Sequence, residues 1–236
     1  MNFILFEPSE RLTLHTASIE DPRRIKHIIE VHQGKLGDEF KVGLINGEMG
    51  SGIISALSDK AIIFDITLTQ LPPQALPLTL ILALPRPKML RRIFQTIATL
   101  GVKELYLINS YRVEKSYWQS PFLQTEAIRH QLILGLEQGG DTLLPEVNLI
   151  KRFKPFVEDE LPQIIKGTRA LVAHPYTAEP CPRAIDYPLT LAVGPEGGFI
   201  DYEIELLKEC GFNAVHLGPR IMRVETAIPY LLGRLY

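Results

Sequence analysis

A cluster of three prolines, Pro72, Pro73 and Pro77, divides this sequence into two regions. Proline has no amide hydrogen and fixes its own φ angle, so such a cluster cannot continue a helix or a central strand. Residues 70–77 are therefore expected to form a linker. The linker separates residues 1–70 from residues 76–236, and the two regions have different apolar patterns.

Residues 1–70 contain short runs of β-forming residues separated by glycine and aspartate turn signals. One helical pattern, over residues 23–31, interrupts them. Many short strands with glycine-rich turns are typical of a small β-barrel. The expected strands cover residues 3–6, 39–45, 52–55 and 61–67.

Strand and helix patterns alternate after the linker. Residues 78–84 form an apolar run typical of a buried strand, and residues 88–100 have apolar side chains at helical spacing on one face. Such alternation predicts an α/β fold with a parallel sheet, whose ligand sites lie at the carboxyl ends of the strands. Further strands are expected over 105–108, 170–173, 189–193 and 214–217, and further helices over 121–139, near 156–165, over 201–210 and at the end of the chain.

Composition and charge restrict the class of protein. The chain has 25 Lys and Arg against 27 Asp and Glu, so any RNA-binding surface must be a local patch. The longest apolar run, residues 78–84, is far shorter than the roughly 20 residues that span a bilayer, and the first residues lack the basic start of a signal peptide. Two cysteines and six histidines show no metal-binding spacing. We therefore expect a cytoplasmic protein with no membrane span and no metal.

A glycine-rich segment follows the strand expected over residues 189–193. Three glycines and a proline lie within residues 194–198, and glycines at a strand end allow a ligand to approach the backbone closely. Asp201 and Glu203, in the first turn of the next helix, would repel a phosphate group there. The segment also lacks the glycine patterns of nucleotide-binding loops, which disfavours a dinucleotide-dependent oxidoreductase. A neutral or cationic ligand and a tight turn without any ligand both stay open.

A second segment, residues 215–227, repeats this order of a strand, a Gly-Pro turn and a helix start. Arg220, Arg223 and Glu225 are crowded at the strand end, where α/β enzymes place their chemistry. Two arginines beside one carboxylate are suited to stabilising an anion. The alternative is a pair of surface charges beside a helix cap.

Together the two segments resemble the C-terminal signature of the RsmE family of 16S rRNA uridine-N3 methyltransferases, within the SPOUT superfamily. Residues 194–198 match its Gly-Pro-Glu-Gly-Gly loop. Residues 217–227 match its Leu-Gly-x-Arg-Ile-Leu-Arg-x-Glu-Thr-Ala segment, with Met222 in place of leucine. His174 and Pro175 resemble the third cofactor loop of the family. A weaker resemblance covers nearly the whole chain.

The resemblance implies a trefoil-knotted methyltransferase domain over residues 76–236 and a PUA-like, RNA-binding β-barrel over residues 1–70. It also implies S-adenosylmethionine as cofactor, a homodimer with the cofactor sites near the subunit interface, and 16S rRNA within the small ribosomal subunit as substrate. Three loops would hold the cofactor, largely through backbone groups. The cofactor-binding residues implied are His174, Pro175, Val193, Gly194, Glu196, Gly197, Gly198, Leu217, Gly218, Ile221, Met222, Arg223 and Thr226.

Arg223 and Glu225 are the catalytic residues that the resemblance favours. Uridine N3 is a poor nucleophile while it carries its proton, and losing that proton puts negative charge on the flanking carbonyl oxygens. Arg223 is suited to stabilising that charge, and Glu225 either to positioning Arg223 or to accepting the proton. The expected RNA-binding residues are Arg86, Lys88, Arg91, Arg92 and Arg220.

The substrate side departs from the family pattern at three positions. Gln33, Thr96 and Asp141 stand where the family has arginine, lysine and arginine. Because each lost cation is expected to remove one phosphate contact, RNA binding should be weaker at physiological salt. Two alternatives therefore stay open, namely a methyltransferase of the same fold with another RNA target, and a non-catalytic RNA-binding or ribosome-assembly protein.

Overall fold

The computed structural model describes residues 3–236 and divides into two compact units. The first unit holds the residues up to Gln74 together with Leu136–Leu144, and the second holds Ala75–Gly135 and Pro145–Tyr236. The division near the proline cluster agrees with a linker there. The return of Leu136–Leu144 to the first unit is a difference from the two continuous regions expected from the sequence.

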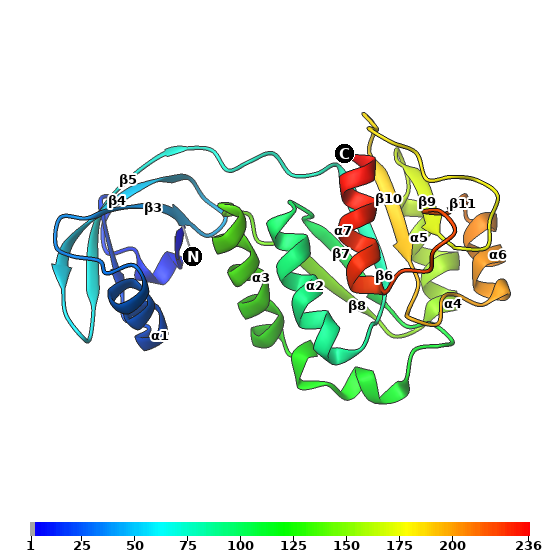
Figure 1. Cartoon of the computed structure of the whole chain (residues 1–236), viewed down its shortest axis with the longest axis horizontal. Helices are drawn as coiled ribbons and strands as arrows, with labels where there is room; N and C mark the ends of the chain where they lie inside the picture. Colours follow the sequence, from blue (N-terminus) through cyan, green and yellow to red (C-terminus); the bar gives the residue numbers. More distant parts are fainter. Residues whose placement is uncertain (1–2) are drawn as a thin grey trace. The chain divides into compact units, whose positions relative to one another are not determined.

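The first unit is a curled five-stranded sheet in the order β1-β3-β4-β5-β2 (Figure 1). β1 and β3 pair in parallel and the other neighbours are antiparallel. The register shifts near Gly50 and Ala56 mark irregularities that bend the sheet. The four expected strands are present, whereas β2 was missed because it is only four residues long and half polar. The strands are β1 (Ile4–Phe6), β2 (Thr16–Ile19), β3 (Glu39–Leu44), β4 (Met49–Leu57) and β5 (Ile62–Gln70).

The helix of the first unit is fixed by one arginine. α1 (Pro22–Lys26) continues as a π turn over His27–Val31, in agreement with the helix expected there. The guanidinium of Arg24 donates to both carboxylate oxygens of Glu10, at 2.7 and 2.9 Å, and to the carbonyl of Leu5 in β1. Because both side chains of this ion pair are largely buried, it joins the helix firmly to the sheet.

The second unit is a six-stranded parallel sheet in the order β11-β9-β10-β6-β7-β8, which confirms the expected α/β fold (Figure 1). β6 and β10 are buried along their whole length, as their apolar sequences predict. β8 was missed because two of its five residues are polar or charged and none of the five is fully buried. The strands are β6 (Leu78–Ala83), β7 (Glu104–Ile108), β8 (Glu146–Ile150), β9 (Arg169–Ala173), β10 (Leu189–Val193) and β11 (Asn213–Val215).

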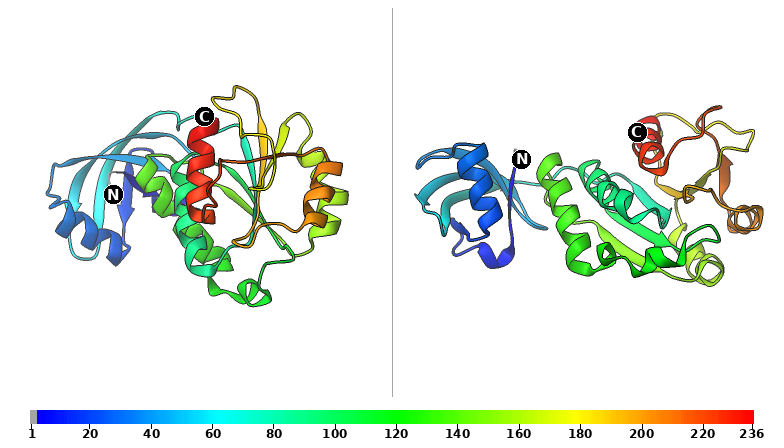
Figure 2. Two further views of the ribbon diagram at one scale, coloured as in Figure 1. Left: turned by 45° about the vertical axis from the view of Figure 1, so that its right-hand side comes forward. Right: turned by 60° about the horizontal axis from the view of Figure 1, so that its bottom comes forward.

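Helices cover both faces of this sheet, with α2 and α7 on one side and α5 and α6 on the other (Figure 2). The helix expected over residues 121–139 begins later. Pro121–Leu123 is a separate 3-10 turn capped by the Ser120 hydroxyl, and the extended backbone of Gln124 delays the helix to Thr125. Among residues 3–236, no helix is long and apolar enough to cross a membrane. The helices are α2 (Pro87–Thr99), α3 (Thr125–Gly139), α4 (Phe153–Pro155), α5 (Leu161–Ile164), α6 (Asp201–Glu209) and α7 (Val224–Leu235).

The segment Leu136–Leu144 is bonded to the first unit through a turn. The Thr142 hydroxyl donates to the carbonyl of Gly47 at 2.5 Å, and the Thr142 carbonyl accepts from the amide of Asn46 at 2.8 Å. Asp141 is 5% exposed, and its carboxylate accepts from the amide of Leu143 at 2.9 Å. A position this buried does not face RNA, so the acid at 141 does not count as a lost phosphate contact.

Glu137 is a buried carboxylate in the same segment. Its side chain is among the buried polar groups, and both carboxylate oxygens lack a hydrogen-bond partner among the described residues. Burial raises the pKa of Glu137 from 4.5 to about 7, and the positive charges of Arg24 and Arg23 offset only part of this effect. Between about pH 4.5 and pH 7, the folded protein therefore keeps a proton on Glu137 that the unfolded chain releases.

We expect Glu137→Gln to stabilise the protein at neutral pH but not in acid. The pKa of Glu137 is higher in the folded than in the unfolded chain, so wild-type stability falls as pH rises from about 4.5 to about 7. Glutamine cannot ionise, so the variant's gain in unfolding free energy should be larger at pH 7.5 than at pH 4, by up to about 3 kcal/mol. Urea unfolding at both pH values measures this difference. Glu209→Gln, on the exposed surface of α6, is the control, and a gain independent of pH would contradict the prediction.

Candidate functional site

Three loops leave the sheet of the second unit side by side. They follow β9, β10 and β11, and the parallel register sets Ala173 beside both Val193 and Val215. Since the strands end together, their loops gather at one edge of the sheet, where α/β folds bind ligands. The two sequence segments singled out above, with His174 and Pro175, are these loops.

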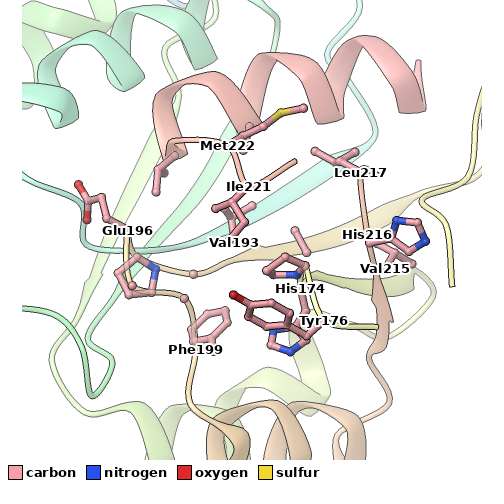
Figure 3. Close-up of a pocket in the computed structure, with 18 of the residues that line it drawn as sticks. His174, Tyr176, Val193, Glu196, Phe199, Val215, His216, Leu217, Ile221 and Met222 are labelled. Atoms are coloured by element: carbon pink, nitrogen blue, oxygen red, sulfur yellow. The ribbon is translucent and has the colours of Figure 1, made fainter. Parts of the chain in front are cut away.

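The three loops enclose a first cavity of about 260 Å³. Figure 3 shows Val193 and Ile221 near its centre, with Phe199, His174 and Tyr176 on one side and Leu217 beyond Ile221. Apolar side chains and backbone dominate this lining, and a small number of polar groups stand among them. This is the usual composition of a small-molecule site.

The glycine-rich loop brings backbone directly to the cavity. A Cβ atom on Gly194 would lie 2.9 Å from the amide nitrogen of Phe199, so only glycine fits this turn. The amide of Gly198 donates to the carbonyl of Pro195 at 2.7 Å and closes the loop. The glycines therefore serve the shape of the loop, and the loop exposes peptide groups to a ligand.

The charges around the first cavity suit a cationic or neutral ligand. The acids Glu196 and Asp201 line it, as do the cations Arg112 and Arg220, so the charges of its lining cancel. Burial lowers the pKa of His174, and the attraction of Asp201 offsets this only in part, so the imidazole is neutral at pH 7. Among residues 3–236, no group of three or more His, Cys, Asp or Glu side chains is arranged to hold a metal ion.

Glu203 has a different role from the one expected from the sequence. It is 3% exposed, and its two carboxylate oxygens accept from the amide of Tyr111 at 2.7 Å and the amide of Ile200 at 3.0 Å. The side chain therefore caps α6 and ties the loop after β7 to this helix, rather than repelling ligands at the helix start. Asp201 is the acid that lines the cavity.

Arg112 holds the glycine-rich loop from outside. Its guanidinium donates to the carbonyl of Gly197, and a Cβ atom on Gly197 would lie 3.0 Å from the Arg112 Cδ atom. On the other side, Glu196 accepts from the amide of Arg86 at 3.0 Å. The loop is thus bonded to the loops that follow β6 and β7.

A second cavity of about 1050 Å³ adjoins the first. Arg86 and Lys88, at the start of α2, line it together with Tyr117 and Phe122. Arg223, Glu225 and Glu196 also line it, and Glu196 lines both cavities. Glu196 therefore stands at the boundary between the two.

The structure divides the residues selected from the sequence between these cavities. Arg223 and Glu225 line the second cavity, without a hydrogen bond or ion pair between them among residues 3–236. Thr226 lines neither cavity, and its amide donates to the carbonyl of Arg223 at 3.0 Å. The expected cofactor-binding residues that line the first cavity are His174, Pro175, Val193, Gly194, Glu196, Gly197, Gly198, Leu217, Gly218, Ile221 and Met222.

The basic residues expected to bind RNA are also divided. Arg86 and Lys88 line the second cavity, whereas Arg220 lines the first. The Arg91 guanidinium lies 5.2 Å from the centre of the Phe122 ring, and Arg92 is exposed on α2. Four of the five are therefore exposed at the start of α2, and only Arg220 lies at the other cavity.

Sequence reasoning missed several side chains of the site. Arg112 could have been predicted from the sequence, because it lies four residues after the end of a predicted strand, where ligands bind in this class of fold. Tyr117 and Phe122 carried none, because they lie in short turns without periodicity. The missed residues include Arg112, Tyr176 and Phe199 in the first cavity, and Tyr117 and Phe122 in the second.

The chain is similar to known methyltransferases over most of its length. A family model described as an RNA methyltransferase domain matches residues 72–236. The ribosomal RNA small subunit methyltransferase E of Treponema pallidum (strain Nichols) is 32% identical, covering 96% of this chain and 87% of that protein. The ribosomal RNA small subunit methyltransferase E 1 of Borreliella burgdorferi is 27% identical, covering 96% of this chain and 94% of that protein.

The fold is also similar to a solved structure. The crystal structure of a ribosomal RNA small subunit methyltransferase E from Neisseria gonorrhoeae, bound to S-adenosyl methionine, superposes with a TM-score of 0.75. The match covers 98% of this chain and 95% of that chain, at 21% sequence identity. The architecture of both units is therefore one that an experimental structure contains.

We expect Arg112→Ala to loosen the glycine-rich loop without unfolding the protein. The substitution removes the contact with Gly197, so the nearby Gly198 amide should exchange with solvent roughly threefold to tenfold faster, as for one lost hydrogen bond. Hydrogen exchange followed by NMR measures this. Arg92→Ala, on the exposed face of α2, is the control, and the buried Leu191 amide should be unchanged. Equal exchange at Gly198 in Arg112→Ala and wild type would show that Arg112 does not hold the loop.

Proposed function

This chain belongs to the RNA methyltransferase family, together with the ribosomal RNA small subunit methyltransferases E, and we propose that it methylates N3 of a uridine in 16S rRNA. The observation that carries the proposal is the pair of adjoining cavities that share Glu196. One has the lining of a small-molecule site, and the other presents Arg223, Glu225 and two further cations. A methyl donor in the first and an RNA base in the second would meet at this boundary.

S-adenosylmethionine fits the first cavity. Its sulfonium carries a positive charge, which suits the acids Glu196 and Asp201 and the neutral His174. The close backbone at Gly194 suits recognition by peptide groups, and the apolar Val193 and Ile221 suit the flat adenine ring. When bound, the cofactor supplies an electrophilic methyl group.

Arg223 and Glu225 are the proposed catalytic residues. The carbonyl of Arg223 accepts from the amides of Thr226 and Ala227, so its backbone is fixed at the start of α7 while its side chain lines the second cavity. A guanidinium at this position is suited to stabilising negative charge on the uracil carbonyl oxygens. Because no bond joins Glu225 to Arg223 in the described chain, we assign Glu225 to accepting the N3 proton rather than to positioning the arginine.

The proposal extends to the architecture and the assembly. We assign a PUA-like, RNA-binding barrel to residues 1–70 and a trefoil-knotted methyltransferase domain to residues 76–236, supported by the insertion of β10 between β6 and β9. Tyr176 and Ile221 line the first cavity yet are 78% and 70% exposed, which supports a homodimer whose partner covers them. A ribosomal substrate supports a cytoplasmic location.

A second candidate function is the same methyl transfer to a different RNA. It is favoured by Gln33 and Thr96, which stand where the family has cations. Gln33 is exposed and Thr96 partly exposed, so both positions can face a ligand. Mapping RNA modifications in cells with and without the gene separates the candidates. Loss of one methyluridine from 16S rRNA supports the first, loss elsewhere supports the second, and no change supports a non-catalytic RNA-binding protein.

We expect Arg223→Ala to reduce methyl transfer by about 100-fold to 1000-fold, the usual cost of removing one donor to a developing anion. Binding of S-adenosylmethionine should stay close to that of wild type, because the Arg223 side chain lines the second cavity and not the first. Methylation of small ribosomal subunits and calorimetric titration of the cofactor measure the two effects. Lys166→Ala, at an exposed position outside both cavities, is the control, and unchanged turnover in Arg223→Ala would remove this arginine from the mechanism.

A further inference from the structure

Two aromatic side chains, Tyr117 and Phe122, form a wall of the second cavity that the proposed catalytic residues do not explain. They lie in consecutive 3-10 turns, Lys115–Gln119 and Pro121–Leu123, between β7 and α3. Both side chains are partly buried. They therefore present ring surface to the cavity while other groups cover the rest of each ring.

Both turns are held in place by polar contacts. The Arg91 guanidinium stacks on the Phe122 ring, and the amide of Phe122 is bonded to the Ser120 hydroxyl at 3.2 Å. The Tyr117 hydroxyl is bonded to Glu114 at 3.2 Å. The indole nitrogen of the neighbouring Trp118 donates to Asn109 at 2.9 Å. Rings fixed in this way lose little conformational entropy when a ligand packs against them.

The charges of the second cavity point to a nucleotide. Arg86, Lys88 and Arg223 supply three cations, Glu225 also lines the cavity, and Glu196 stands where it adjoins the first cavity. Aromatic walls beside cations are the recurring way in which proteins bind single-stranded RNA, with bases on the rings and phosphates at the cations. A volume of about 1050 Å³ accommodates one nucleotide with its neighbouring phosphates.

We propose that this cavity receives one uridine turned out of the RNA chain, with its base stacked on Tyr117 and Phe122. Its phosphates contact Arg86 and Lys88, and the N3 edge of the base faces Glu225 and the boundary at Glu196. Enzymes that modify a base must bring it out of its stack, and the stacking lost in the RNA is replaced here by the two rings. The inference rests on the proposed function, because methylation of N3 requires the uracil base itself to reach the boundary with the first cavity.

The kinetic test uses Tyr117→Ala, Phe122→Ala and the conservative Tyr117→Phe in the full-length protein. Loss of one stacking ring should raise the KM for RNA about fivefold to a hundredfold, while the Kd for S-adenosylmethionine stays within twofold of wild type. Tyr117→Phe keeps the ring and should restore the KM. Tyr202→Ala, an exposed aromatic on α6 outside both cavities, is the matched control. A wild-type KM in both alanine variants would overturn the proposal.

A second measurement does not depend on variants or on turnover. Single-stranded RNA carrying 5-iodouridine at the target position is cross-linked to the wild-type protein by light, and the attached peptide is identified. Cross-linking within residues 115–122 supports the proposal, and cross-linking confined to other segments overturns it. If wild-type protein methylates no RNA yet cross-links at 115–122, the proposed function fails while the base-binding role of the cavity stands.

Discussion

The pairing of β10 with both β6 and β9 is the constraint on which the site depends. The two parallel ladders place Val193 beside Leu82 on one side and Ala173 on the other. The glycine-rich loop must then leave the sheet between the loops that follow β6 and β9. The contact of the Glu196 carboxylate with the amide of Arg86 follows from this position. If β10 lay at an edge of the sheet, the glycine-rich loop would not lie between these two loops and would not line a cavity with them.

The two cavities divide the chemistry between them. The first is formed by backbone and apolar side chains, whose shape is set by the three strand ends. The second is formed by long charged and aromatic side chains from α2, from the turns before α3 and from the start of α7. Glu196 belongs to both, and its bond to the amide of Arg86 joins the two walls.

The sequence predicted the central strands well because burial on both faces leaves a plain signal. Residues 189–193 were expected as a strand and are one, whereas the half-exposed, partly polar β8 was missed. The first cavity followed from loops that match a known signature. The second could not be predicted, because Phe122 and Arg223 lie about 100 positions apart and only the fold brings them together. Burial changed the interpretation of two acids. Glu203 caps α6 and Asp141 belongs to a turn, so neither carboxylate faces a ligand.

The central position of β10 also affects the synthesis of the chain. Leu189 pairs with Leu78, about 110 positions earlier, so one edge of β6 has no partner until β10 has been made. At usual translation rates this interval lasts roughly 5 to 20 s. An apolar strand with an unpaired edge is a template for pairing with other chains. The arrangement that completes the site therefore leaves the nascent protein open to aggregation until its last quarter has emerged from the ribosome.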